Sequence, residues 1–425
     1  MTITIDGTVG ANKAVVLDSA GKLPAIDGSF LTTLNATQVT TGSIATARID
    51  TGTTTGKVLV LDGSGNMPAI AGGALTGVES ATKSASDPTV LTNPATGLGT
   101  KWINTTSGDI YVCTDATTDE NVWTNVGAGT GNIQPWVFQG TTYGYTSGGW
   151  NVSPAYDVID KFSFTSDGNA TDVGNLTQAR TDGCGLSSAD YGWTCAGRGP
   201  TWSTQHNIID KFSFVSDGNA TDSGDLLTAH TSPAGQSSTT YGYISGGGEP
   251  TAVNSIQKFA FASGGNTSAI SGVLTTARRS TDGCSHTTHG YTVGGSSPYS
   301  NVIDKFSFAT DGNSTDVGDL TVGRGSAATA SSATHGFKAG GAAPTAVVDK
   351  WSFTSDGNAV DHGDLSASRY GVCGQSATAY GYSSGGYTNS YTDLIDKYAY
   401  ISNTTATDVG NLTVGKGDRP MGHQV

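Results

Sequence analysis

The sequence predicts an all-β protein in which residues 136–425 form a six-bladed β-propeller, a ring of four-stranded sheets. The first observation behind this prediction is a block of 45 to 50 residues that recurs six times. The second is the composition: glycine supplies 61 of 425 residues, about twice its usual share, and only 13% of the residues are charged. Few stretches show the apolar period of a helix. We therefore expect many short strands joined by tight turns.

Four landmarks define the recurring block. The first is an aromatic-Gly-aromatic segment that ends in small residues, found at 143–149, 191–197, 241–247, 289–295, 335–341 and 380–386. The second resembles IDKFSF and lies at 159–164, 209–214, 256–261, 303–308, 348–353 and 395–400. The third is a turn such as SDGN, at 166–169, 216–219, 263–266, 310–313 and 355–358, with SNTT in the sixth copy. The fourth is a short segment that ends in a base, at 176–180, 226–230, 274–278, 320–324, 365–369 and 412–416.

Each block therefore predicts four strands. In the second copy they are 183–188, 191–197, 207–214 and 223–230. IDKFSF alternates apolar and polar residues, which is the pattern of a strand with two different faces. Asp-Gly after it favours a hairpin turn, because glycine accepts a positive φ. Four antiparallel strands in about 45–50 residues make one propeller blade.

These features resemble the Kelch repeat and the central domain of galactose oxidase. The resemblance lies in the Gly-Gly that ends the second strand, the aromatic residue in the third, and the loop before the next strand of small residues. It covers about 290 residues. Most copies lack the tryptophan typical of the Kelch fourth strand, and the DGN turn is unusually regular. Two segments compete to close the ring, 421–425 and 137–140, and we expect closure by the C-terminal one because an unclosed ring leaves an unpaired edge strand.

The N-terminal third reads as a series of small β units. Residues 13–34 repeat at 57–78, so 1–81 is predicted to be a repeated stalk or attachment segment. Residues 82–97 are predicted to be a linker, 98–126 a small β module, and 127–135 a second linker. Trp102, Tyr111 and Trp123 would form the core of the module. The order of these units resembles the stalk of bacteriophage tail fibres. This resemblance implies a homotrimer attached to other tail or baseplate proteins.

One face of the ring is predicted to carry the longer loops that join the second and third strands of each block. These loops differ in length and content while the flanking strands barely change, as in binding loops held on a rigid scaffold. Aromatic side chains and one histidine in them could stack on sugar rings or on a protein partner. The alternative is packing between blades. The candidate binding residues are Trp150, Tyr156, Trp202, His206, Tyr299, Tyr387 and Tyr391.

A base recurs at one position of the block, on the same face. This basic ring could hold a carboxylate or phosphate of a surface glycan. The alternative, which the sixfold repetition favours, is a structural hydrogen bond to loop carbonyls or to an Asp. The ring consists of Arg180, His230, Arg278, Arg324, Arg369 and Lys416.

Metal and catalytic sites find little support in the sequence. His286 and His289 form HxxH, but His289 occupies a repeat position that is usually Tyr, so no metal is expected there. The Asp residues of the DGN turns could hold calcium, although the hairpin explains them more simply. Cys184, Cys284 and Cys373 are expected as buried small residues at one strand position near the axis, and no disulfide framework is expected. No cofactor or catalytic set is predicted.

The functional prediction is a virion fibre protein located in the phage particle, with the propeller binding a host-surface receptor, most simply a glycan. One alternative is a structural or decorating virion protein whose propeller binds another virion protein. A second alternative is a glycan-degrading tailspike. The net charge of −14 argues against nucleic acid, whose phosphates need a basic surface. No apolar run is long enough to insert into a membrane.

Overall fold

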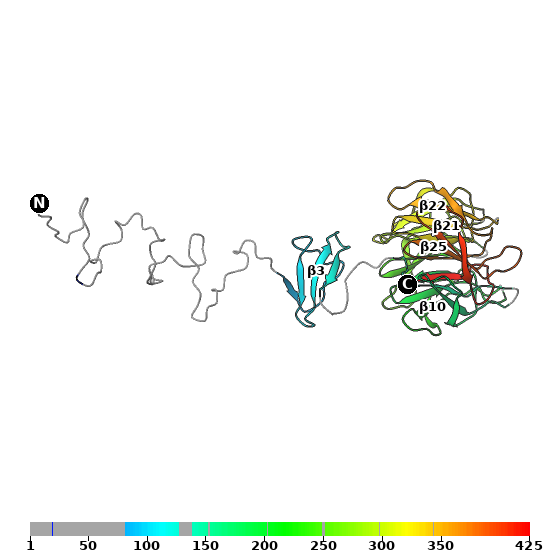
Figure 1. The fold of residues 1–425 in the computed structure, drawn as a ribbon. Helices are drawn as coiled ribbons and strands as arrows, with labels where there is room; N and C mark the ends of the chain where they lie inside the picture. The colour runs from blue at the N-terminus through cyan, green and yellow to red at the C-terminus, as the bar shows by residue number, and fades with distance from the viewer. Residues whose placement is uncertain are drawn as a thin grey trace.

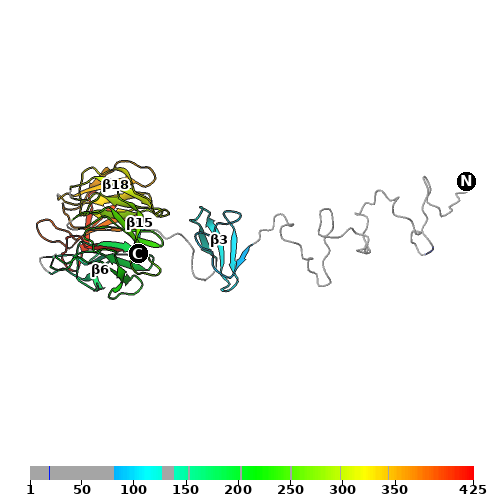
Figure 2. The same ribbon diagram turned by 180° about the vertical axis from the view of Figure 1, so that it is seen from behind.

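The protein was analysed as a computed structural model that describes residues 81–126 and 138–425 except 152, 153, 202, 249, 250, 297 and 343, together with Ser19. The expected stalk, apart from residues 19 and 81, and the expected linker at 127–135 lie outside these residues. The described part contains 28 strands and no helix, and the strands form seven sheets of four (Figures 1 and 2). The prediction of an all-β protein is therefore confirmed.

The first sheet contains β1 (Thr82–Ser84), β2 (Lys101–Asn104), β3 (Ile110–Asp115) and β4 (Val122–Asn125). β1 pairs in parallel with β2, and the other pairs are antiparallel. The expected core is confirmed, because Trp123 and Tyr111 are buried and Trp102 packs against them.

The prediction of a linker at 82–97 is wrong. This segment supplies strand β1, and the side-chain amide of Asn121 donates to the carbonyl of Val90 at 2.9 Å. The backbone makes most of these contacts, so the Ser- and Thr-rich segment shows no apolar alternation that would mark it as part of a sheet.

The other six sheets occupy residues 138–425 and share one strand order. We number them from the sheet that contains β5: sheet 1 is β28-β5-β6-β7, and sheets 2 to 6 follow as β8–β11, β12–β15, β16–β19, β20–β23 and β24–β27. The innermost strands are β28 (Met421–Gln424), β8 (Cys184–Ser187), β12 (Ala234–Ser237), β16 (Asp282–Ser285), β20 (Ala328–Ser331) and β24 (Cys373–Ser376). The second strands are β5 (Tyr143–Ser147), β9 (Tyr191–Cys195), β13 (Tyr241–Ser245), β17 (His289–Val293), β21 (His335–Ala339) and β25 (Tyr380–Ser384).

The third and fourth strands lie progressively farther from the axis. The third strands are β6 (Val158–Ser163), β10 (Ile208–Ser213), β14 (Ser255–Ala260), β18 (Val302–Ser307), β22 (Val347–Ser352) and β26 (Leu394–Ala399). The fourth strands are β7 (Thr171–Asn175), β11 (Thr221–Asp225), β15 (Ser268–Val273), β19 (Thr315–Asp319), β23 (Val360–Asp364) and β27 (Thr407–Asn411). Within each sheet, neighbouring strands are antiparallel, as the hairpin signals predict.

The C-terminal strand completes sheet 1, as expected. β28 pairs with β5, and the backbone N–H groups of 141, 142 and 143 all donate to the carbonyl of Val425. The competing segment does not enter sheet 1: Gly140 instead forms a parallel bridge with Ala377 in sheet 6. β28 carries Met421 and His423, and the full burial of both side chains favours this strand as the innermost strand of sheet 1.

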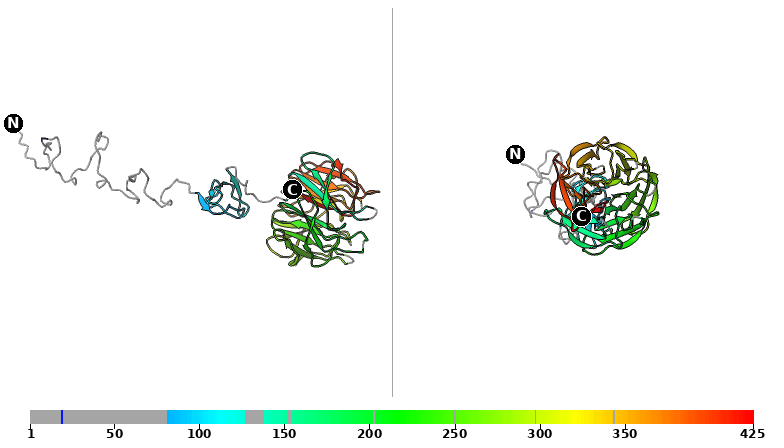
Figure 3. Two further views of the ribbon diagram at one scale, coloured as in Figure 1. Left: turned by 90° about the horizontal axis from the view of Figure 1, so that it is seen from below. Right: turned by 90° about the vertical axis from the view of Figure 1, so that its right-hand side faces the viewer.

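The innermost strands contact one another in the cyclic order β28, β8, β12, β16, β20, β24 and back to β28. Viewed along the axis, the sheets surround a common centre (Figure 3). Five of the six strands carry glycine at their second position: Gly185, Gly235, Gly283, Gly374 and Gly422. A Cβ at any of these would lie no farther than 2.5 Å from a backbone carbonyl of the preceding inner strand. Glycine therefore sets how closely the inner strands approach around the axis.

Aromatic rings fill the space between neighbouring sheets. Tyr145 of sheet 1 lies 4.9 Å from Phe214 and 5.6 Å from Phe212 of sheet 2, measured between ring centroids. The same arrangement recurs between the following sheets. The glycine of the aromatic-Gly-aromatic motif lies under a ring of its own sheet; a Cβ on Gly192 would clash with Phe212. The motif thus encodes the packing between sheets.

Candidate functional site

The connections of the six-sheet domain sort onto two faces. The loops between second and third strands meet the connections that lead to the next innermost strand. In every copy, the second residue after the second strand donates its backbone N–H to the carbonyl of the basic residue. Gly149, for example, donates to Arg180 at 2.9 Å. We call this the loop face. The DGN turns lie at the other end of the strands, on what we call the turn face.

The candidate aromatic residues of the loop face differ in exposure. Tyr299 is 56% exposed, and Tyr156 and His206 are half-buried. Trp202 lies outside the described residues. Trp150 is only 8% exposed, and its backbone pairs with Gly417 in both directions. The prediction of Trp150 as an exposed contact is therefore wrong, because its loop forms a small bridge with the last connection of the ring.

Four tyrosines and an acid form a cluster on the loop face. Ring centroids of Tyr370 and Tyr387 lie 5.5 Å apart, and those of Tyr387 and Tyr391 lie 5.1 Å apart. The Tyr391 hydroxyl donates to Oδ2 of Asp418 at 2.9 Å. Burial raises the pKa of Tyr370, and Asp418, Tyr387 and the nearby Tyr299 add to the rise. We call Tyr299, Tyr370, Tyr387, Tyr391 and Asp418 the tyrosine cluster.

Tyr370 is a cluster member that was not among the residues predicted from the sequence. It follows the base of its copy, at a position filled elsewhere by Thr181, Thr231, Arg279, Gly325 and Gly417. A single aromatic residue at an otherwise non-aromatic repeat position is the signal that could have found it.

Electrostatics couple the cluster to a neighbouring acid. Burial is the main cause that raises the pKa of Asp418, the hydrogen bond from Tyr391 opposes the rise, and Asp182 adds to it. Asp182 itself forms an ion pair with Arg198, with Oδ2 of Asp182 3.0 Å from Nε of Arg198. Burial, followed by Asp418, raises the pKa of Tyr391. The cluster therefore presents neutral phenol rings beside polar groups, an arrangement that suits a neutral polar ligand with ring faces.

The basic ring is buried, so the interpretation as a solvent-facing anion site is wrong. Arg180, Arg324, Arg369 and Lys416 are fully buried or nearly so. Each base of this kind pairs with the Asp of the third strand in the next sheet, and the guanidinium of each Arg also donates to a backbone carbonyl there. The pairs are Arg180–Asp210, Arg278–Asp304, Arg324–Asp349, Arg369–Asp396 and Lys416–Asp160, at 2.8 to 3.2 Å. The structural alternative that the repetition favours is the correct one.

We call each of these buried base–Asp pairs between neighbouring sheets a lock. One copy replaces both members of its lock. His230 stands in place of the Arg, and Gln257 stands in place of the Asp on the next sheet. His230 bonds to the Thr228 hydroxyl at 2.8 Å, and Gln257 accepts from the backbone of Leu227 at 3.0 Å. Burial lowers the pKa of His230, which favours its neutral form. A neutral pair therefore replaces the charged pair as a unit, since one buried charge without its partner would be costly.

The DGN turns link neighbouring sheets on the turn face through side-chain contacts that we call clasps. Asp356 accepts an ion pair from Lys305 of the preceding sheet at 2.9 Å, and Oδ1 of Asn358 accepts the backbone N–H of Asp319 at 3.0 Å. Equivalent ion pairs are Lys161–Asp217, Lys258–Asp311 and Lys397–Asp167. At least one carboxylate oxygen of each of these Asp residues is thus engaged in a structural ion pair. The turn at 263–266 lacks Asp. The lysine of the preceding sheet, Lys211, instead lies with its Nζ 3.8 Å from the Tyr191 ring centroid.

The remaining candidate groups have local explanations. His286 packs beside Phe353, and burial lowers the pKa of His289. In the described part of the chain, no three His, Cys, Asp or Glu residues come together in a way that could hold a metal ion. All five cysteines are free and buried. Cys184 and Cys373 share the first position of their strands, whereas Cys284 takes the third, so the expectation of one shared position is wrong for Cys284.

The chain matches no protein-family model and no curated protein. Within the described residues, no helix has the length and apolar character needed to span a membrane.

Proposed function

We propose that residues 136–425 form a six-bladed β-propeller that acts as the receptor-binding head of a virion fibre, with the tyrosine cluster on its loop face as the contact site. The ligand class that fits this site is a host-surface glycan. The N-terminal third would attach and trimerise the fibre, in keeping with its resemblance to tail-fibre stalks. The proposal draws on two features of the described residues, the place where the chain enters the six-sheet domain and the cluster itself.

The chain enters the domain near the axis on the turn face. The carbonyl of Phe138 accepts a hydrogen bond from the Gln424 side chain at 3.0 Å, and Gly140 donates to the carbonyl of Ser376 at 2.8 Å. Gln424 and Ser376 are the last residues of innermost strands, at the end remote from the loop face. Residues 138–140, where the described domain begins, thus lie on the side opposite the variable loops. This polarity leaves the loop face available to a target.

The observation that carries the proposal is the asymmetry of the tyrosine cluster. The inter-sheet locks and clasps occupy the repeated positions of the domain. Tyr370 is aromatic where the other copies are not, whereas Tyr387 aligns with Trp150 and Tyr391 with Tyr299. Among the described residues, this sector brings the three rings together. Tyrosine rings pair an apolar face with a hydroxyl, which suits stacking on sugar rings. Asp418 adds a hydrogen-bond acceptor at the edge of the stack.

The test is binding of the full-length chain to arrayed bacterial surface glycans and to bacterial cells, with the Tyr387→Ala variant beside it. The matched control is Tyr143→Ala, which removes a 39% exposed tyrosine from the turn face. We expect saturable binding that falls at least about tenfold in Tyr387→Ala, since one aromatic contact is worth roughly 1–3 kcal/mol, and that is unchanged in the control. Equal losses in both variants would contradict the assignment of the site. Absence of binding to any cell or glycan would favour a structural virion protein instead, and release of free sugar would favour a tailspike.

A further inference from the structure

The last connection of the ring contains one residue more than the other five. In five copies the base and the first residue of the innermost strand are four positions apart, for example Arg180 and Cys184, whereas Lys416 and Met421 are five positions apart. The extra residue is Arg419, whose φ of 63° is unusual for a large side chain. It follows Asp418, which takes the repeat position with positive φ. Because this backbone conformation is unfavourable for arginine, we expect the contacts of its side chain to offset the cost.

The Arg419 side chain reaches across the axis. Nη2 donates to the carbonyl of Thr281 at 2.6 Å and to that of Pro233 at 3.2 Å, and it lies 3.4 Å from Oδ1 of Asp282. Asp282 begins β16 in sheet 4, which is the sheet opposite sheet 1 in a cycle of six. Among the innermost strands, only β16 starts with a charged residue. The single inserted arginine thus meets the single acid at that strand position.

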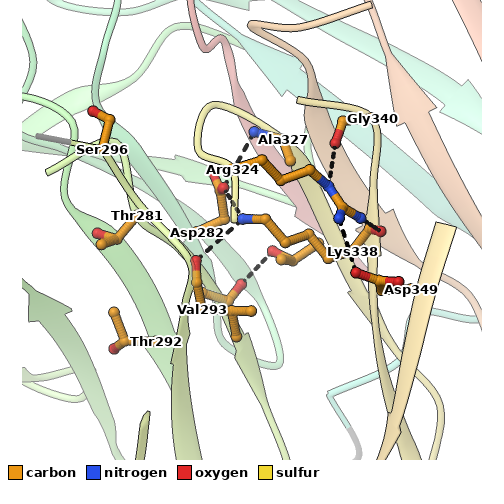
Figure 4. A network of polar contacts seen from close by, with 12 residues as sticks. Thr281, Asp282, Thr292, Val293, Ser296, Arg324, Ala327, Lys338, Gly340 and Asp349 are labelled. Carbon is orange, nitrogen blue, oxygen red and sulfur yellow. Dashed lines mark hydrogen bonds and ion pairs between the residues drawn. The ribbon is translucent and has the colours of Figure 1, made fainter. Parts of the chain in front are cut away.

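A second buried cation shares this carboxylate. Nζ of Lys338 pairs with Oδ2 of Asp282 and donates to the carbonyl of Val293 at 3.1 Å, and Asp282 also accepts the backbone N–H of Ala327 (Figure 4). Lys338 is fully buried. The nearby Arg324–Asp349 pair is balanced by itself (Figure 4). Two cations, Arg419 and Lys338, therefore share the carboxylate of Asp282, while the neighbouring Asp418 and Asp182 face Arg198.

Arg419 also has donors that the protein does not fill. Its side chain is 8% exposed, yet Nε and Nη1 donate to no acceptor among the described residues. Arg419 lines an axial cavity of about 70 Å³, together with Asp282, Cys373 and Met421. This volume admits a halide ion, a carboxylate group or about two water molecules. Buried guanidinium donors without acceptors are costly, and an anion in the cavity would supply the missing acceptor.

We infer that the axial cavity beneath Arg419 is a binding site for one small anion, of the size of a halide or a carboxylate group. Arg419 supplies the contacting N–H donors, and Lys338 supplies the second positive charge. The site is separate from the tyrosine cluster, and the inference does not depend on the proposed function. The anion would complete the hydrogen bonding of the connection that closes the ring.

Protonation of Lys338 links anion binding to pH. Burial above all lowers the pKa of Lys338 to about 8; Asp282 opposes this change, and Arg324 and Arg419 add to it. Above this pH the ammonium loses its proton, so one of the two positive charges that share Asp282 disappears. Anion affinity is therefore expected to fall as pH rises from 7 to 9. A bound anion would in turn favour the protonated lysine.

The test measures the excess ³⁵Cl NMR line width that the full-length chain induces in dilute chloride. We expect an excess that is displaced by bromide and by acetate and that weakens between pH 7 and 9. Arg419→Gln should reduce chloride affinity by about tenfold or more, since a hydrogen bond from a charged donor is worth roughly 1.5–3 kcal/mol. The control is Lys258→Gln, which removes one positive charge and one ion pair on the turn face and should leave the line width unchanged.

Two further arms complete the test. Glucuronate that displaces chloride where glucose does not would assign the site to the carboxylate of an acidic sugar, whereas bromide competition alone would assign it to an inorganic ion. If Arg419→Gln fails to fold, bromide competition and the pH profile of the unaltered protein decide the matter. The inference is overturned by an absence of excess line width in the unaltered protein, by a pH-independent excess, or by an unchanged excess in folded Arg419→Gln.

Discussion

The buried lock between neighbouring sheets makes the sharpest prediction for stability. In sheet 4 the guanidinium of Arg324 pairs with Asp349 of sheet 5 at 2.8 Å, and the two side chains are 1% and 0% exposed. Arg324 also donates to the carbonyls of Gly340 and Lys338. We predict that Asp349→Gln and Arg324→His each destabilise the protein strongly, whereas the two changes together cost much less than their sum.

The magnitude follows from burial. Removing one partner of a buried ion pair leaves the other charge uncompensated and typically costs about 3–5 kcal/mol. For a domain of this size that corresponds to a fall in Tm of roughly 6–15 °C. The double variant copies the His230 and Gln257 combination that the chain already uses between sheets 2 and 3. Because both groups are then neutral, we expect a coupling energy of about 3 kcal/mol between the two sites.

The assay is urea unfolding of the full-length chain, followed by tryptophan fluorescence for the unaltered protein, both single variants and the double variant. An unchanged m-value would show that the native and unfolded states keep their compactness. The reasoning is refuted if either single change costs less than about 1 kcal/mol. It is equally refuted if the two costs add, because the locks would then not act as units.

Three further predictions concern the axis and the turn face. Burial lowers the pKa of His423 to about 4, so this histidine stays neutral in the folded protein, whereas the unfolded chain takes up a proton below pH 6.5. About 3 kcal/mol of stability should therefore be lost as pH falls from 6.5 to 4. The His423→Gln variant should lose this part of the pH dependence of stability. Asn358→Ala should cost about 1 kcal/mol by releasing the Asp319 N–H, whereas Asp356→Asn should cost less because its ion pair is exposed, both read from urea unfolding. Gly422→Ala should lower Tm by several degrees, because its Cβ would meet the carbonyl of Gly374.

Each of these predictions has a defined contrary result. For His423, the idea fails if the variant retains the full pH slope, and glutamine suits the test because two other copies carry it at that strand position. For the clasp, a larger loss from Asp356→Asn than from Asn358→Ala would reverse the assignment. For the axis, Gly312→Ala is the control, because a Cβ there meets only the Thr310 hydroxyl oxygen at 3.7 Å; equal effects of the two glycine changes would disprove the packing argument.

Several site assignments could not be made from the sequence because they depend on pairs of residues far apart in the chain. The bases of the ring repeat in the sequence, but their Asp partners lie on the next sheet, about 30 residues on. The joint change to His230 and Gln257 was a visible sign of that pairing. Trp150 looked like a loop residue open to solvent, and only its pairing with Gly417 buries it. Tyr370 and Arg419 each depart from the repeat in the sequence, but only the tertiary structure shows their partners, Tyr387 and Asp282.

By itself, the sequence determined the all-β class, the four-strand unit and the C-terminal strand that completes the first sheet. These features follow from local chemistry: side-chain alternation, glycine at turns and the repeated motif act within a few residues of each other. Only the tertiary structure decided that the bases are buried locks, that residues 82–97 belong to a sheet, and that Arg419 reaches Asp282 across the axis. Exposure and partner choice depend on how sheets pack, and packing brings together residues whose separation in the chain carries no local signal.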